Sequence, residues 1–251
     1  MLEYYKEYCK KYNVIWNYLR NNSTKSVDEI TNDICTMRKY YDSYERFKRV
    51  FQKVGIVYID SSEKDIKELQ NKSFDDMALF TEEGRFLLNC RYIVPVKDML
   101  GNVIALIGWY PDDRKYITTP SKYFDRSSLF FGLEQLSETG IYKEYFLVEG
   151  IFDCIALRSY GFPAIAQMGV EMRRKKEVLY KLFKRLVAIP DNDKVGKRVL
   201  SNDLWKLPLG SSYLRWSGGL TQGTEDDNSV EEANFYIKDI DILCKLFDEE
   251  S

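Results

Sequence analysis

Four carboxylates stand just past two short apolar runs, where buried strands would end. Glu149 follows the run YFLV and Asp153 comes four residues later, while Asp191 and Asp193 follow the run LVAI and Pro190. Like charges this close repel each other, so water, a helix N-terminus or a divalent cation must offset them. Mg²⁺ prefers oxygen ligands and usually shares them with substrate phosphates, so the spacing indicates metal-dependent phosphate chemistry.

Each acid taken singly also has a structural interpretation. Asp193 would cap the helix that follows it, and Asp153 would complement the dipole of its own helix. The joint pattern is more specific: strand-Glu-Gly-x-x-Asp, then strand-Asp-x-Asp-x-x-Gly. A third acidic group, Asp226 and Asp227, follows the run SSYLRW and a glycine-rich loop. In a parallel sheet all these acids would converge on the edge where ligands bind.

The composition of the chain excludes several kinds of chemistry. Among 251 residues there is no histidine, which rules out Ser-His-Asp and Cys-His catalysis and histidine-ligated zinc. The five cysteines are scattered without a CxxC pair, so we expect reduced thiols. The formal net charge is −2, so nucleic-acid binding would need a local basic patch. No signal peptide or membrane span is predicted, which favours a cytoplasmic location.

The elements that must position these acids are predicted from residue periodicity. An N-terminal helical region includes a capping box, Ser26 and Glu29, and a stop at Gly55. Two β-runs then meet at a turn over 100–102, followed by a loop over 114–132 that mixes basic and aromatic residues. From residue 139 strands alternate with helices, which predicts a mainly parallel sheet. A helix is expected over 172–186 and a final one over 229–247.

The fold class is therefore α/β (α+β overall). The predicted parts are an N-terminal helical region, a small mixed α/β subdomain, a parallel-sheet domain, and an acidic loop with a final helix, over residues 1–75, 76–138, 139–222 and 223–251.

Two quoted stretches resemble a known family. The sequence VEGIFDCIALRSYGFPAIAQMG followed by LVAIPDNDKVGKR is similar to the Toprim domain shared by topoisomerases and bacterial-type primases. Upstream, RYIVPVKDMLGNVIALIGWY, KYITTP and FFGL occur in the order typical of the subdomain that precedes Toprim in DnaG-type primases. Type IA topoisomerases and small Toprim nucleases lack that subdomain. The resemblance implies a Rossmann-like, mainly parallel Toprim sheet after a small α/β subdomain and N-terminal helices.

The resemblance also implies roles for individual residues. The expected metal-binding acids are Glu149, Asp153, Asp191, Asp193 and Asp226, of which Glu149, Asp191 and Asp193 would be catalytic. The expected nucleotide- or DNA-binding residues are Arg91, Lys115, Arg126 and Asn228. One departure concerns Trp109, which stands where the family usually has an arginine.

The implied function is that of a DNA primase core. It would join ribonucleoside triphosphates into short RNA primers on single-stranded DNA, using Mg²⁺ or Mn²⁺, in the replication of a phage or mobile element in a bacterial cytoplasm. A replicative helicase and a separate zinc-binding or accessory protein are expected partners, because the family's zinc ribbon and helicase-docking domain have no match here. Two alternatives stay open: a Toprim nuclease that hydrolyses phosphodiesters, and a non-catalytic helicase-loading or DNA-binding subunit.

Overall fold

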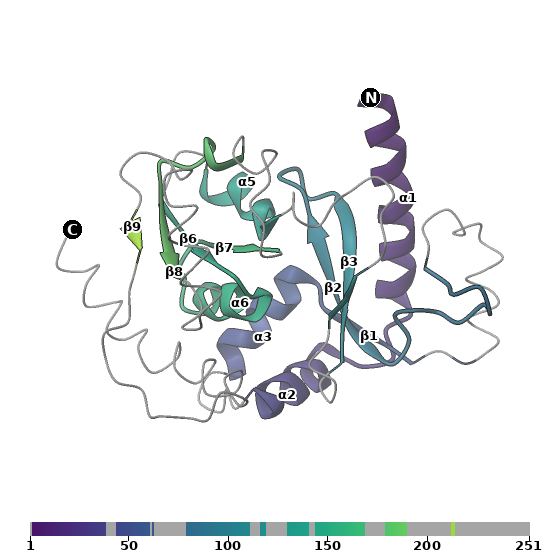
Figure 1. Ribbon diagram of the computed structural model, residues 1–251. Coiled ribbons are helices and arrows are strands. Elements are labelled where there is room, and N and C mark those ends of the chain that lie inside the picture. The colour runs from purple at the N-terminus through teal and green to yellow at the C-terminus, as the bar shows by residue number, and fades with distance from the viewer. Residues whose placement is uncertain are drawn as a thin grey trace, which may run out of the picture. The chain divides into compact units, whose positions relative to one another are not determined.

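A computed structural model gives the structure of the chain (Figure 1). It describes residues 2–38, 44–60, 62, 79–110, 116–118, 130–140, 144–168, 179–189 and 212–213. The chain divides into two compact units. The first contains Met1–Ile34 and Lys48–Asp125, and the second contains Cys35–Phe47 and Arg126–Ser251.

The first unit is built on a four-stranded antiparallel sheet in the order β1-β2-β3-β4. The strands are β1 Val57–Ile59, β2 Arg91–Lys97, β3 Val103–Trp109 and β4 Tyr116–Thr118. The two predicted β-runs are confirmed as β2 and β3. Their turn is held by Asp98, whose Oδ1 accepts the backbone N–H groups of Leu100 (2.9 Å) and Asn102 (2.8 Å).

Helix α1, Leu2–Asn21, lies along β3 (Figure 1). It buries side chains at helical spacing, among them Tyr8, Tyr12, Ile15 and Leu19. Polar contacts fix it to the strand: the Tyr8 hydroxyl donates to the Ile104 carbonyl (2.9 Å). The described helices that follow are α2, Val27–Met37, and α3, Tyr44–Val54. None of the helices within the described ranges is long and apolar enough to cross a membrane.

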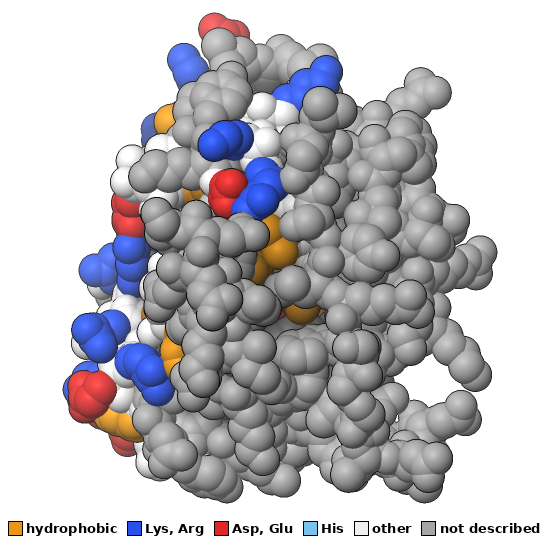
Figure 2. All heavy atoms as spheres, turned by 90° about the vertical axis from the view of Figure 1, so that its left-hand side faces the viewer, with side chains coloured by type: hydrophobic (Ala, Val, Ile, Leu, Met, Phe, Trp, Pro, Cys, Tyr) orange, Lys and Arg blue, Asp and Glu red, His pale blue; other side chains and the backbone are white. Residues whose placement is uncertain are grey.

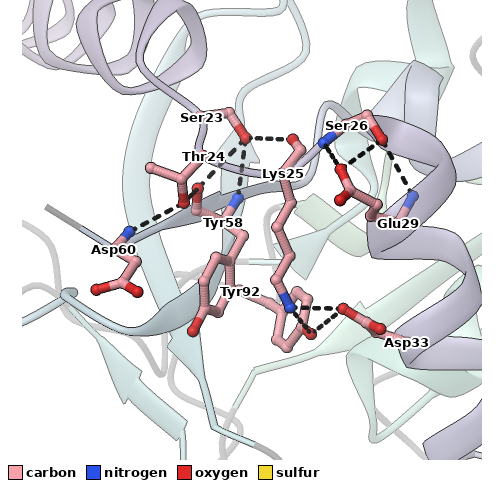
Figure 3. A network of polar contacts seen from close by, with 9 residues as sticks. All are labelled: Ser23, Thr24, Lys25, Ser26, Glu29, Asp33, Tyr58, Asp60 and Tyr92. Carbon is pink, nitrogen blue, oxygen red and sulfur yellow. Dashed lines mark hydrogen bonds and ion pairs between the residues drawn. The ribbon is translucent and has the colours of Figure 1, made fainter.

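The connection between α1 and α2 confirms the predicted capping box (Figure 3). The Glu29 N–H donates to Ser26 Oγ (3.2 Å), and the Ser26 N–H donates to Glu29 Oε2 (2.7 Å). One residue earlier, Lys25 Nζ donates to Asp33 Oδ2 (2.7 Å), which also accepts the Tyr92 hydroxyl (2.7 Å). Because Asp33 belongs to α2 and Tyr92 to β2, this network ties α2 to the sheet.

The second unit contains a five-stranded sheet in the order β5-β7-β6-β8-β9. Its strands are β5 Phe130–Phe131, β6 Glu144–Val148, β7 Ala164–Gln167, β8 Arg185–Ile189 and β9 Ser212–Tyr213. The pairs β6–β7, β6–β8 and β8–β9 are parallel, and β5 is antiparallel to β7. The predicted α/β architecture with a mainly parallel sheet is therefore confirmed.

Helices accompany this sheet at two places. The 3₁₀-helix η4, Leu133–Gln135, leads into the short helix α5, Leu136–Thr139, and α6, Ile151–Ser159, connects β6 to β7. Gly161 follows the end of helix α6 and lies in the left-handed region at φ 93°, the conformation that glycine commonly adopts after a helix. Aromatic and aliphatic side chains of the strands form a buried core with Tyr180 and Phe183.

Four details of the predicted elements are wrong. The helical prediction for residues 1–75 is too broad, because the β-branched run after Gly55 forms β1. The stretch 114–132, predicted as loop, contains β4 and β5, which are too short to show a periodic pattern. The helix predicted over 172–186 extends too far, because β8 already begins at Arg185. The predicted helix over 229–247 lies outside the described residues.

Candidate active site

The two predicted acidic strand ends lie side by side in the sheet. Strands β6 and β8 are parallel neighbours, and their last residues, Val148 and Ile189, are partners in register. Glu149 follows Val148 directly, and its side chain is partly exposed. Strand β8 therefore ends level with the strand that leads to Glu149, at the edge where open α/β sheets bind ligands.

Asp153 lies in the first turn of α6, whose N-cap is Gly150. The sequence suggests that Gly150 is needed for a tight turn, but the structure contradicts this reason: its φ of −91° and ψ of 146° are ordinary extended values. Space explains the glycine instead. A Cβ atom on Gly150 would lie 2.1 Å from Asp153 Oδ2, so the carboxylate occupies the volume that a side chain would need.

Opposing influences act on the Asp153 carboxyl group. Burial raises its pKa, whereas the positive charge of Arg38 and the backbone N–H groups of Asp153 and Gly150 lower it. Arg38 belongs to the 35–47 segment that groups with the second unit, and its guanidinium carbon lies 4.3 Å from the centre of the Phe152 ring. A segment far away in the sequence therefore brings a positive charge to the acidic helix N-terminus.

The rest of α6 is anchored to neighbouring elements. Cys154 Sγ donates to the Ala164 carbonyl of β7 (3.2 Å). At the far end of α6, Arg158 Nη1 forms an ion pair with Glu134 Oε1 (2.9 Å), and both side chains are largely buried. These contacts fix the helix that carries Asp153. They join residues more than nine positions apart, and sequence periodicity carries no signal for them.

In the first unit, Arg91 has the properties of an anion-binding side chain. Its Nε and Nη1 atoms are buried and have no hydrogen-bond partner among the described residues. Its guanidinium carbon lies 5.6 Å from the centre of the Tyr110 ring. Gly108 lies on the neighbouring strand β3, and a Cβ atom there would be 2.8 Å from Arg91 Cδ. The missing side chain of Gly108 therefore leaves room for Arg91. Buried donors of this kind are normally satisfied, which favours an anionic ligand.

Trp109, the departure from the family pattern, is buried within a row of aromatic rings. Tyr58, Tyr92 and Trp109 are successive register partners across β1, β2 and β3, with ring centres 4.9 and 5.6 Å apart. The next register partner, Tyr116 on β4, is more exposed, at 39%. Trp109 therefore packs within the sheet and does not replace the charge of an arginine.

Six of the nine predicted site residues lie outside the described residues, so no geometry is given for them: Asp191, Asp193, Asp226, Asn228, Lys115 and Arg126. Within the part of the chain that the structure describes, no group of three acids, cysteines or histidines suits a metal ion. The described donors, Glu149 and Asp153, nevertheless have the hard oxygen atoms that Mg²⁺ and Mn²⁺ prefer. Burial disfavours the charged Asp153, and a bound cation would offset that cost.

Comparison with known proteins agrees with this geometry. A family model described as Toprim-like matches residues 146–215, which include the end of β6 and all of α6, β7, β8 and β9. The DNA primase of Thermotoga maritima is 30% identical over 122 residues, which are 45% of this chain and 21% of that protein. The chain spans about a fifth of the length of the curated DNA primases of Thermotoga maritima and Clostridium acetobutylicum.

Solved structures show the same fold. A DnaG primase catalytic domain bound to single-stranded DNA has a TM-score of 0.68 at 18% identity, covering 87% of this chain and 76% of that one. The catalytic core of E. coli primase has a TM-score of 0.65 at 18% identity, covering 89% and 75%. The chain is therefore similar in sequence to DNA primases over part of its length, matches a Toprim-like family model, and has the fold of the DnaG catalytic core.

Proposed function

We propose that this chain synthesises short RNA primers on single-stranded DNA. The observation that carries the proposal is the level ending of β6 and β8, which presents Glu149 beside the end of the strand that precedes Asp191. In this reaction a hydroxyl oxygen attacks the α-phosphorus of a ribonucleoside triphosphate. A new P–O bond forms, the bond to the β-phosphate breaks, and pyrophosphate leaves.

The acids have distinct proposed roles. Glu149, Asp191 and Asp193 are the catalytic set, and with Asp153 and Asp226 they would hold Mg²⁺ or Mn²⁺, which supplies charge stabilisation to the phosphate oxygens when bound. Glu149 is also placed to accept the proton of the attacking hydroxyl, because its partly exposed carboxylate follows the strand end. No histidine is available for that proton transfer anywhere in the chain.

Cationic, amide and aromatic side chains would bind nucleic acid and nucleotide. Arg91 would donate its two unsatisfied N–H groups to a phosphate. Lys115, Arg126 and Asn228 are assigned to nucleotide or template by the family resemblance alone. The exposed ring of Tyr116 is suited to stack on an unpaired base. Figure 2 shows lysine and arginine side chains interspersed with acidic ones over the described part of one face.

The test is primer synthesis from labelled ribonucleotides on single-stranded DNA with Mn²⁺. We expect Asp191→Asn and Glu149→Gln to abolish product and leave the unfolding temperature nearly unchanged. Glu144→Gln is the matched control, because Glu144 lies at the opposite end of the strand that leads to Glu149. Full activity of Asp191→Asn would contradict the proposal.

The same assay separates the alternative functions. Shortened DNA without new RNA indicates a Toprim nuclease, and DNA binding without metal-dependent turnover indicates a non-catalytic subunit. A helicase and a zinc-binding or accessory protein are proposed partners, to be tested by adding each to the assay. The phage or mobile-element setting and the cytoplasmic location stay predictions.

A further inference from the structure

The contact between Gly150 and Asp153 has a consequence for Glu149. A Cβ atom on Gly150 would approach Asp153 Oδ2 to 2.1 Å and Asp153 Cγ to 3.2 Å. The distance to Oδ2 is shorter than real Cβ atoms show and the distance to Cγ is tight, so any other residue at position 150 must move the carboxylate. The backbone of Gly150 itself would accept alanine or serine, because its φ and ψ are ordinary extended values.

The Asp153 carboxylate acts on the backbone beside Glu149. Gly150 is the N-cap of α6 and has no side chain to satisfy the free N–H groups of the first turn. Asp153, three residues on, stands where the acid of a capping box stands: its Oδ2 occupies the space next to the Gly150 backbone, and the Gly150 N–H lowers the pKa of the carboxyl group. That N–H belongs to the peptide bond that joins Glu149 to Gly150. When this N–H is held in place, the plane of the Glu149–Gly150 peptide is fixed, and with it the direction in which the Glu149 side chain leaves the strand.

We propose that Gly150 is a positioning residue whose missing side chain lets the Asp153 carboxylate hold the Glu149–Gly150 peptide, and thereby sets the direction of Glu149. The inference rests on the proposed function only for the role of Glu149. The steric part concerns two residues of this chain and is tested without any activity.

The test distinguishes two reasons for the glycine: clearance, meaning the space that the Asp153 carboxylate needs, and the residue preferences of a helix N-cap. Serine is a good N-cap residue and alanine a poor one, so a capping role for residue 150 predicts that Gly150→Ser is tolerated and Gly150→Ala is not. Clearance predicts that both variants are impaired, because both carry a Cβ atom. Clearance also predicts that Gly150→Ala has no further effect once Asp153→Ala has removed the carboxylate.

The first measurement is the urea unfolding midpoint, with and without Mn²⁺, of wild type, Gly150→Ala, Asp153→Ala and the double variant. The second is the Mn²⁺ concentration that gives half-maximal primer synthesis. We expect Gly150→Ala, Gly150→Ser and Asp153→Ala each to raise that concentration by about tenfold, the scale of losing a group that orients a metal ligand. The double variant should match Asp153→Ala within about twofold, since effects of contacting residues are not additive.

Each outcome has a defined reading. The inference is overturned if Gly150→Ala has the same effect in the wild-type chain and in the Asp153→Ala variant. It is also overturned if the Gly150→Ser variant behaves as wild type. If Gly150→Ala fails to fold, recovery of folding in the double variant supports the inference and failure of both overturns it. If wild type makes no primer, the proposed function fails, and the cycle of unfolding midpoints still decides the steric inference.

Discussion

Removing one partner of the ion pair between Glu134 and Arg158 should strongly destabilise the second unit. Their side chains are 15% and 5% exposed, and Nη1 and Oε1 are 2.9 Å apart. Removing one partner of a buried pair leaves a desolvated charge without compensation, which costs about 3–5 kcal/mol. Glu134→Gln keeps an oxygen acceptor near Arg158 and removes only the charge, so we expect a cost near the lower limit, about 3 kcal/mol.

The same unit offers a matched control in the pair Glu144–Arg185. Its atoms are 2.7 Å apart, slightly closer than those of the buried pair, but the side chains are 41% and 30% exposed. Solvent screens such a pair, so Glu144→Gln should cost less than about 1 kcal/mol. The two substitutions are chemically identical and differ only in burial.

The assay is thermal unfolding followed by circular dichroism. For a chain of this size about 1 kcal/mol lowers the unfolding temperature by roughly 2–4 °C. Glu134→Gln should therefore lower it by about 6–12 °C and Glu144→Gln by less than about 4 °C. The double variant Glu134→Leu with Arg158→Met should recover part of the loss, because it leaves no buried charge. Equal shifts for the two glutamine variants would refute the argument from burial.

Two further predictions concern the first unit. Above about pH 10 the first unit should lose stability, because burial and the hydrogen bond to Asp33 raise the pKa of Tyr92 to about 12, and Asp33 also raises the pKa of Lys25. At these pH values the unfolded chain releases protons that the folded state keeps, so the loss of stability falls between the unfolded and the folded pKa values and is absent below pH 10. Urea unfolding midpoints measured from pH 8 to 12 check this. The decrease of the midpoint with pH above pH 10 should be smaller in Tyr92→Phe. Tyr116→Ala should weaken single-stranded DNA binding by about 1–3 kcal/mol, the scale of one stacked base. Fluorescence anisotropy measures this loss, and Val14→Ala, at another exposed apolar side chain, should bind as wild type.

Patterns confined to a few neighbouring residues were predictable from the sequence. The Ser26–Glu29 capping box, the turn at Gly101 and the helix end at Gly161 depend on local hydrogen bonds and on glycine's access to positive φ. The alternation of strands and helices after residue 139 likewise predicted the parallel sheet. These features follow from local chemistry, which a single sequence contains.

Features that depend on tertiary packing were not predictable. No local pattern relates Arg38 to Asp153, because the fold alone brings the 35–47 segment to the second unit. Strands β4 and β5 have three and two residues, too few for a period of two to be detected. The Glu-Gly-x-x-Asp spacing was recognised, but the reason for its glycine was not, since clearance depends on the rotamer of Asp153.

Helix α6 is held by contacts at three positions along its length. It is held at its start by Asp153 over Gly150, in its middle by Cys154 on the Ala164 carbonyl, and near its end by Arg158 on Glu134. A rigid helix transmits a displacement at one anchor to the others, so substitutions at the anchors should couple. Glu134→Gln removes the charge that holds Arg158 near the end of α6, far from Glu149. It should therefore raise the Mn²⁺ requirement of primer synthesis as well as lower stability. Glu144→Gln should leave the Mn²⁺ requirement unchanged and have only the small effect on stability given above.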